Sequence, residues 1–362
     1  MAIDRRELLL GAAAVGTLGA AGKSASQSDA RSRELSSVKV IDVHTHMFSR
    51  GWMEAVRAAR DPNFQLGEGA NDGSLIYRGA SIGRIVPAMI DFDIRIKAMD
   101  AAKVDVALIS LTAPNVYWGT RAQSAAAART INDDFAAAQN KYAGRIRWFA
   151  SLPFGNAEDA IAEARRAKKN GAIGICTLTN ILGTALTAPQ YRPIWREIEA
   201  MQMPVFIHPT APYVDGMGLA DYGLFNSIGF TSETSLCFAR MIFDGFMDEF
   251  PKLNMIACHG GGAFPYLVAR FDIMWQRTQG AGSKIKSPPS SYMRRIYFDS
   301  IVYDQKTLNF LVEQVGADRV LYGSDYPFQI GDMPGVLARV DALPATQRDA
   351  IRGGNASRLF DL

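Results

Sequence analysis

Eight short apolar runs are spaced along the chain, and most are followed by an amphipathic stretch of helix length. Each run stops at a polar or Gly/Pro cluster, and several are apolar throughout, which is typical of parallel strands covered on both faces. The predicted strands are Val38–His46, Val104–Leu111, Ile146–Pro153, Ala172–Leu178, Pro204–His208, Asn254–His259, Ile296–Ile301 and Val320–Asp325. The predicted helices lie near Ile94–Ala102, Arg121–Lys141, Ala157–Lys169, Pro193–Met201, Ser232–Phe250, Phe264–Gln276, Thr307–Val315 and Ala345–Leu359.

Eight β/α units in about 320 residues predict a (β/α)8 TIM barrel. A doubly wound sheet is the alternative, but no GxGxxG or P-loop spacing follows any of the runs. One segment departs from the pattern, because Phe48–Asp93 forms a long insertion between the first two strands. An insertion of this length is either a functional lid or a disordered loop, and its aromatic and apolar content favours the lid.

The first thirty-five residues are expected to be a targeting segment. Arg5 and Arg6 precede a weakly apolar, Gly/Ala-rich stretch that is similar to a twin-arginine export signal and is too short to span a membrane. The alternative is a helical extension that contains an Arg pair by chance. The predicted organisation is a twin-arginine-type signal peptide and disordered lead-in over residues 1–35 and a catalytic domain over residues 36–362. The expected location is periplasmic or otherwise exported, or cytoplasmic if the leader is not functional.

Composition narrows the classes of partner. Lys and Arg total 39 and Asp and Glu total 36, which leaves a net charge of +3, and no Lys/Arg-rich run occurs. We therefore expect neither a nucleic-acid nor a membrane partner. Three cysteines cannot form a disulfide framework. Cys258, which directly precedes His259, is expected to face the helices rather than a site.

The chain contains only four histidines, and all four fall at the ends of predicted strands. His44 and His46 end the first strand, His208 ends the fifth and His259 ends the sixth, while Asp325 ends the eighth. Barrel enzymes carry their working residues at the C-terminal ends of the strands. These five residues are therefore the candidate functional site.

The spacing of His44 and His46 has a physical reason. Residues two apart on a strand project to the same face, so both imidazoles can chelate one ion at the barrel mouth. His208 and Asp325 would complete a set of three nitrogens and one oxygen. That set suits Zn²⁺ best, with Mn²⁺, Fe²⁺ or Co²⁺ as alternatives, and leaves a position for water or substrate. An isolated His-x-His pair is more often structural, and the strand-end positions of the other two residues favour the metal site.

The motifs around these residues are VIDVHTH at Val40–His46, VFIHP at Val205–Pro209, HGGGAFP at His259–Pro265 and GSDYP at Gly323–Pro327. Together they resemble the amidohydrolase superfamily, and more narrowly its branch around aminocarboxymuconate-semialdehyde decarboxylase. The similarity extends from about residue 38 to about residue 358 and includes RIKAMD at Arg95–Asp100.

The resemblance implies a role for each matching position. It implies that His44, His46, His208 and Asp325 are metal ligands. It also implies that His259 is the catalytic histidine that takes a proton from metal-bound water. It implies that Arg84, in the insertion, pairs with a substrate carboxylate. It also implies that Arg270 reaches the site of a neighbouring subunit, which makes a homodimer the expected assembly. Asp299, at the end of the seventh strand, either contacts the substrate or orients a ligand.

Elementary chemistry agrees with these roles. A divalent ion lowers the pKa of bound water, imidazole accepts protons near neutrality, and a guanidinium matches a carboxylate. The expected function is a metal-dependent, non-oxidative decarboxylase, a carboxy-lyase, that acts on a small unsaturated or aromatic carboxylate. The alternative is a metal-dependent hydrolase of a lactone, a cyclic amide or a C–C bond, because the same ligands serve both reactions. A non-catalytic metal-binding barrel is disfavoured, because a structural site needs only its ligands and this chain places a further histidine, His259, at a strand end.

Overall fold

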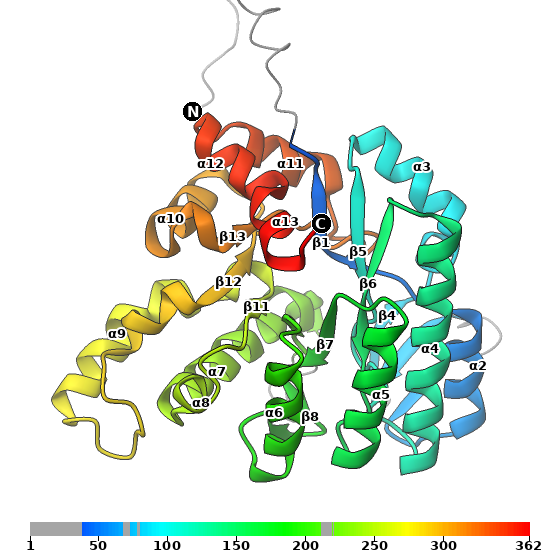
Figure 1. Ribbon diagram of the computed structural model, residues 1–362, viewed down its shortest axis with the longest axis horizontal. Helices are drawn as coiled ribbons and strands as arrows, with labels where there is room; N and C mark the ends of the chain where they lie inside the picture. The colour runs from blue at the N-terminus through cyan, green and yellow to red at the C-terminus, as the bar shows by residue number, and fades with distance from the viewer. Residues whose placement is uncertain (1–37, 68–72, 78–79, 211–218, 220) are drawn as a thin grey trace, which may run out of the picture. The chain divides into compact units, whose positions relative to one another are not determined.

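The computed structural model describes residues 38–67, 73–77, 80–210, 219 and 221–362 (Figure 1). The predicted leader over residues 1–35 lies outside the described residues. All eight predicted strands of the barrel are present and pair in parallel in the order of the chain. They are β1 (Ile41–His46), β5 (Val106–Ser110), β6 (Ile146–Ser151), β7 (Gly174–Leu178), β10 (Val205–His208), β11 (Met255–Ala257), β12 (Ile296–Asp299) and β13 (Val320–Leu321).

The segment that follows β13 closes the ring against β1. The Val43 amide donates to the carbonyl of Tyr322 at 2.9 Å, and the Asp325 amide donates to the carbonyl of His44 at 2.8 Å. Thr45 and Tyr326 complete this junction as a parallel bridge. The (β/α)8 barrel predicted from the sequence is therefore confirmed, and the doubly wound alternative is wrong.

Helices connect successive strands, as the alternating pattern predicts. They include α3 (Phe92–Ala102), α4 (Arg121–Lys141), α5 (Ala157–Lys169), α6 (Arg192–Ala200), α7 (Phe230–Phe243), α9 (Phe264–Arg277) and α10 (Gln305–Val315). In Figure 1, α4, α5 and α6 lie outside the strands. The buried face of α5 is rich in small residues, because Ala160, Ala164 and Ala167 are buried there. Small side chains allow a helix to approach the sheet closely.

Two predicted helices are interrupted. The predicted helix over Ser232–Phe250 consists of two helices, α7 and α8 (Phe246–Glu249), because Gly245 adopts a left-handed φ of 71° between them. The last predicted helix comprises α12 (Ala345–Asp349), a π-helical turn (Ala350–Gly354) and α13 (Asn355–Phe360). A further helix, α11 (Met333–Asp341), was not predicted.

The insertion after β1 contains regular structure in its described parts. It forms α2 (Arg50–Ala59) and an antiparallel sheet of β2 (Phe64–Leu66), β3 (Ser74–Tyr77) and β4 (Ala80–Arg84). Helix α2 packs beside α4 (Figure 1). The indole of Trp52 is fully buried and donates to the carbonyl of Asn115 at 3.0 Å, which fixes α2 to the loop after β5. The action of this insertion as a lid stays a prediction.

A compact cluster of apolar side chains fills the barrel interior. It consists of Ile41, Val43, Val106, Leu108, Phe149, Cys176, Phe206, Ile256, Cys258 and Leu321, with Ala356 and Phe360 of α13. The expectation that Cys258 faces the helices is wrong. Strand β11 ends at Ala257 and His259 adopts a left-handed φ of 54°, so the strand alternation does not continue to His259. Within the described residues, no helix is long and apolar enough to cross a membrane.

Candidate metal centre

Strand β1 delivers two of the predicted ligands to the barrel mouth. The pairing of β1 with β5 shifts register between Asp42 and Thr45, and such an irregularity re-aims the side chains that follow it. As a result Ile41 and Val43 pack in the interior cluster, whereas the Nε2 atoms of His44 and His46 lie 3.0 Å apart. Both imidazoles are fully buried.

The other two predicted ligands come from the opposite side of the barrel and from its closing segment. His208 ends β10, and Asp325 follows β13 with a left-handed φ of 59°, a conformation that aspartate tolerates better than most residues. Asp325 Oδ1 lies 3.3 Å from His46 Nε2 and 3.5 Å from His44 Nε2. One ligand atom from each of the four residues lies within 4.8 Å of the others, and all four residues are buried. The structure thus brings together the four predicted ligands.

Each of the three ligand histidines is oriented by a hydrogen bond at its far ring nitrogen. The Nδ1 partners are Asp299 Oδ2 at 2.6 Å for His44, Ser110 Oγ at 3.1 Å for His46 and the Pro209 carbonyl at 2.7 Å for His208. The Thr112 hydroxyl also lies near the His208 ring, 3.2 Å from Nδ1 and 3.3 Å from Nε2. The carboxylate and the carbonyl only accept, so they favour a proton on Nδ1 of His44 and His208 and leave the Nε2 lone pair for a metal, whereas the Ser110 hydroxyl can take either role.

The electrostatics of the set favour neutral imidazoles at His46 and His208 and an ionised carboxylate at Asp325. Burial lowers the pKa of His46 to about 4 and holds the pKa of His208 well below its ordinary value. Burial alone would raise the pKa of Asp325, but hydrogen bonds from His259 and His46 hold it well below the ordinary value. Burial would likewise lower the pKa of His44, but the Asp299 carboxylate outweighs it and raises that pKa. Metal binding requires neutral imidazoles and an ionised carboxylate.

The residues present therefore fit a divalent cation. Three imidazole nitrogens and one carboxylate oxygen are donors that suit Zn²⁺, Mn²⁺, Fe²⁺ or Co²⁺. A second group of donor atoms, from His44, Cys258 and Asp299, also lies within 4.8 Å. In that group His44 Nδ1 and the Asp299 carboxylate are hydrogen-bonded to each other. Burial also raises the pKa of the Cys258 thiol well above its ordinary value. The first set is the metal centre that the chemistry supports.

His259 lies beside this set. Its Nε2 is 3.5 Å from Asp325 Oδ2, and its backbone amide donates to Asp299 Oδ2 at 2.8 Å. The Nδ1 atom is buried, and no group among the described residues forms a hydrogen bond with it. The side chain is 12% exposed, whereas the ligand histidines are closed off. Its imidazole is therefore the most exposed of the four, and its proton-transfer role stays a prediction.

Asp299 lies behind the ligands. Its carboxylate accepts from His44 Nδ1 and from the backbone amides of His259, Gly260 and Ile301, at 2.6 to 3.0 Å. The side chain is fully buried. Its hydrogen bond to His44, one of the predicted metal ligands, is observed. Its contact with a substrate stays a prediction.

The two predicted arginines lie on the surface of the single chain. Arg84 ends β4, Arg270 lies on α9, and both are exposed. Within the described part of the chain, no hydrogen bond or ion pair joins either guanidinium to the metal centre. Their roles toward substrate therefore stay predictions.

Several neighbours of the site were not identified from the sequence. Ser110 is the last residue of β5 and Thr112 lies two residues beyond it, and such polar residues at a strand end were an available signal. Arg95, on α3, is fully buried against the backbone that follows His44, and nothing in the pattern of that helix marks it as buried.

A cavity adjoins His208 at the mouth. Leu178, the strand partner of His208, lines it together with Thr210 from the loop after β10. Aromatic side chains form much of the rest, namely Phe64 and Tyr77 of the insertion and Tyr117 and Trp118 after β5. None of the predicted metal ligands lines this cavity, whose aromatic walls lie near the end of the strand that carries His208.

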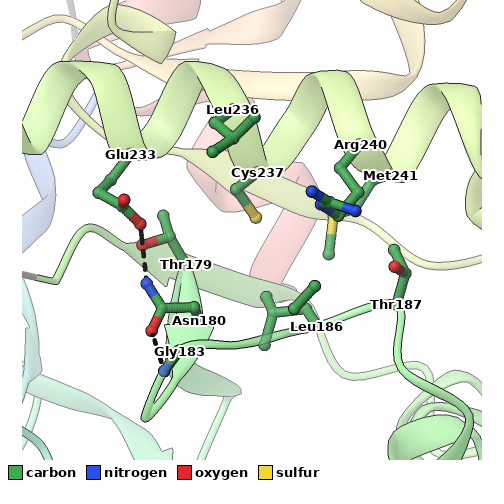
Figure 2. A pocket seen from close by; sticks show the side chains of 11 residues that line it. Thr179, Asn180, Gly183, Leu186, Thr187, Glu233, Leu236, Cys237, Arg240 and Met241 are labelled. Carbon is green, nitrogen blue, oxygen red and sulfur yellow. Dashed lines mark hydrogen bonds between the residues drawn. The ribbon is translucent and has the colours of Figure 1, made fainter. Parts of the chain in front are cut away.

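A second cavity lies outside the barrel mouth, between α7 and the hairpin of β8 (Asn180–Ile181) and β9 (Thr184–Ala185). Figure 2 shows Glu233 and Arg240 of α7 on one wall, with Glu233 accepting hydrogen bonds from Thr179 and Asn180. None of the predicted site residues lines this cavity.

Comparison with known proteins places this geometry in a family. The profile of the family described as amidohydrolase matches residues 41–362. The chain is 29% identical over 339 residues to 2-amino-3-carboxymuconate-6-semialdehyde decarboxylase of Dictyostelium discoideum, which covers 89% of this chain and 91% of that protein. It is 28% identical to gamma-resorcylate decarboxylase of a Rhizobium strain, covering 84% of this chain and 98% of that protein.

A solved structure shows the same fold with a ligand in place. The 5-carboxyvanillate decarboxylase of Novosphingobium aromaticivorans, complexed with manganese and 4-hydroxy-3-methoxy-5-nitrobenzoic acid, is 26% identical to this chain. The match has a TM-score of 0.78 and covers 90% of this chain and 97% of that one.

Proposed function

The chain belongs to the amidohydrolase family, and from that premise we propose that it is a metal-dependent decarboxylase of a small aromatic carboxylate. The observation that carries the proposal is the buried set of His44, His46, His208 and Asp325. A cavity with aromatic walls near the end of the strand that carries His208 supports an aromatic substrate. The relatives named above, which are decarboxylases of aromatic or muconate-type acids by name, support the reaction class.

The four ligands would hold one divalent ion, for which Zn²⁺ is our first choice and Mn²⁺, Fe²⁺ and Co²⁺ are alternatives. When bound, such an ion would supply Lewis acidity and stabilise the negative charge that develops as CO2 leaves. Mn²⁺ gains weight from the manganese in the related structure.

We propose that His259 moves the proton. In a non-oxidative decarboxylation the bond between the ring carbon and the carboxylate carbon breaks, its electron pair stays on the ring carbon, and that carbon takes up one proton as CO2 departs. The imidazole of His259 is partly exposed at the edge of the ligand set, with its Nε2 3.5 Å from Asp325 Oδ2. It can deliver this proton, or take one from a water molecule in the hydrolytic alternative.

Arg84 is our candidate for holding the substrate carboxylate, because its exposed guanidinium ends the insertion strand β4. We also propose a homodimer in which Arg270 serves the neighbouring site. Helix α9 supports this assembly, because Tyr266, Ile273 and Met274 are 78%, 49% and 51% exposed on the helix that carries Arg270. A charge placed at Ile273 should then dissociate the dimer in sedimentation experiments and lower activity.

We further propose that residues 1–35 direct export. Fusing them to a reporter that is active only outside the cytoplasm should produce signal, and replacing Arg5 and Arg6 by Lys should abolish it. A signal that survives the Lys pair would leave the leader without a twin-arginine function.

Product analysis tests the reaction. The protein without residues 1–35, loaded with Zn²⁺ or Mn²⁺, is incubated with hydroxybenzoates, muconate-type acids, lactones and cyclic amides, and the products are identified by mass spectrometry. Loss of CO2 from a hydroxybenzoate is the expected result. Gain of water with retention of the carboxylate would overturn the decarboxylase and move the protein to the hydrolases. Metal-stripped protein is the matched control.

A further inference from the structure

Arg95 of α3 is a buried arginine with an unusual set of partners. It is fully buried, and no carboxylate of the described residues lies within ion-pair distance of its guanidinium. Its Nη1 donates to Thr45 Oγ1 at 2.6 Å and its Nη2 donates to the carbonyl of His46 at 2.5 Å. A buried charge persists only where neighbouring groups compensate for lost hydration, so this placement calls for an explanation.

The same guanidinium also reaches the segment that closes the barrel. Nη2 lies 3.5 Å from the carbonyl of Tyr326, and the guanidinium carbon lies 4.9 Å from the centre of the Tyr326 ring. That carbonyl accepts two further hydrogen bonds, from the His46 amide at 2.8 Å and from Thr45 Oγ1 at 2.9 Å. One side chain therefore binds two of the three segments that carry metal ligands, residues 44–46 and residues 325–326.

Charge by itself does not explain this position. The buried carboxylates of Asp299 and Asp325 adjoin the ligand histidines, whereas burial raises the pKa of Asp42 to about 7. A fixed positive charge near a cation site opposes cation binding, so removing it would strengthen binding if charge were its main contribution. The favourable contribution comes from the hydrogen bonds of Arg95. They need the planar guanidinium, which reaches two carbonyls and one hydroxyl.

We propose that Arg95 is a positioning residue of the metal centre: it holds the His44–His46 strand and the Asp325 segment in the register that places their ligand atoms around one ion. This inference rests on the proposed metal centre, and it adds a residue that contacts neither the ion nor the substrate. Outer partners of this kind typically contribute about 10- to 100-fold to metal affinity.

Two variants of Arg95 separate positioning from charge. Arg95→Lys keeps the charge and loses the fork, whereas Arg95→Met loses both. Zn²⁺ and Co²⁺ dissociation constants are measured by competition with a chromophoric chelator, and the visible absorption bands of the Co²⁺ form report ligand geometry. If Arg95 positions the ligands, both variants bind metal about 10- to 100-fold more weakly and the Co²⁺ bands shift.

Other outcomes overturn the inference. If Arg95 acts only through its charge, Arg95→Lys keeps the wild-type dissociation constant and Arg95→Met binds metal more tightly. Arg352→Met is the matched control, because Arg352 is also buried but pairs with Asp341 away from the site. It should lower stability with an unchanged metal dissociation constant. If Arg95→Met does not fold, Arg95→Lys alone decides. Wild-type protein that binds no divalent ion would instead refute the metal centre itself.

Discussion

Replacing Asp299 by asparagine tests whether this carboxylate orients a ligand or contacts a substrate. The wild-type carboxylate accepts four hydrogen bonds, with Oδ2 facing His44 Nδ1 and the His259 amide and Oδ1 facing the Gly260 and Ile301 amides. Asparagine has one acceptor oxygen, and its amide group would face two N–H donors whichever way it turns. Two hydrogen bonds are therefore lost in either orientation while His44 keeps its proton on Nδ1, as metal binding through Nε2 requires.

The magnitude follows from those two bonds. A hydrogen bond to a charged group contributes about 1.5–3 kcal/mol, so the free energy of unfolding of the metal-free protein should fall by about 3–6 kcal/mol. The His44 ring also loses the charged partner that fixes its tautomer, so metal affinity should fall by about 10- to 100-fold. Urea unfolding followed by circular dichroism measures the first quantity, and competition with a chromophoric chelator measures the second.

The matched control is Asp304→Asn, five residues along the chain. Asp304 is an exposed N-cap carboxylate that accepts from the Thr307 amide at 3.0 Å. Its replacement should affect stability less and leave the metal dissociation constant unchanged. A variant Asp299→Asn that keeps wild-type stability and metal affinity, and raises only KM, would refute the orienting role and establish substrate contact.

Three further predictions concern the site and its support. His259→Gln should retain one metal per chain, measured by elemental mass spectrometry, while kcat falls by about 10²- to 10⁴-fold; retained turnover would sink the proton-transfer role. Asp325→Ala should lose metal on dialysis, because the set keeps only neutral donors; stoichiometric metal after dialysis would contradict its place in the set. Gly262→Ala should lower the free energy of unfolding by about 2–5 kcal/mol, because a Cβ there would lie 2.2 Å from the Thr231 carbonyl at a φ of +64°. Gly144→Ala is the control, because Gly144 has a φ of +79° and no atom lies within 4 Å of an added Cβ. It should lower the free energy of unfolding by about 1–2 kcal/mol through backbone strain alone. Equal losses of stability in the two variants would refute the steric clash at Gly262.

The secondary structure was largely predictable because local signals were strong. Helix α4 begins after Thr120, which forms a capping box with Gln123, and its bounds match the predicted Arg121–Lys141. Helix α11 was missed although Asp332 caps it and a proline stands in its first turn. Helix α11 is only nine residues long and closely follows the GSDYP motif.

Departures from strand alternation could not be predicted, because they depend on pairing. The register shift in β1 places Val43 in the interior cluster and His44 at the metal centre, although they are adjacent in sequence. The left-handed backbone at His259 likewise ends the alternation and turns Cys258 inward. Both features arise from hydrogen bonds to residues far along the chain, which no local pattern reveals.

The sequence by itself determined the barrel, the four metal ligands and the position of His259 at a strand end, because periodicity and strand-end chemistry are local properties of the chain. Tertiary structure alone decided which groups support those ligands. Asp299 is 255 residues from His44 along the chain, and Arg95 reaches Tyr326 across 231 residues. Closure of the barrel brings these segments together, and only then can a buried carboxylate orient an imidazole and a buried guanidinium join two ligand segments.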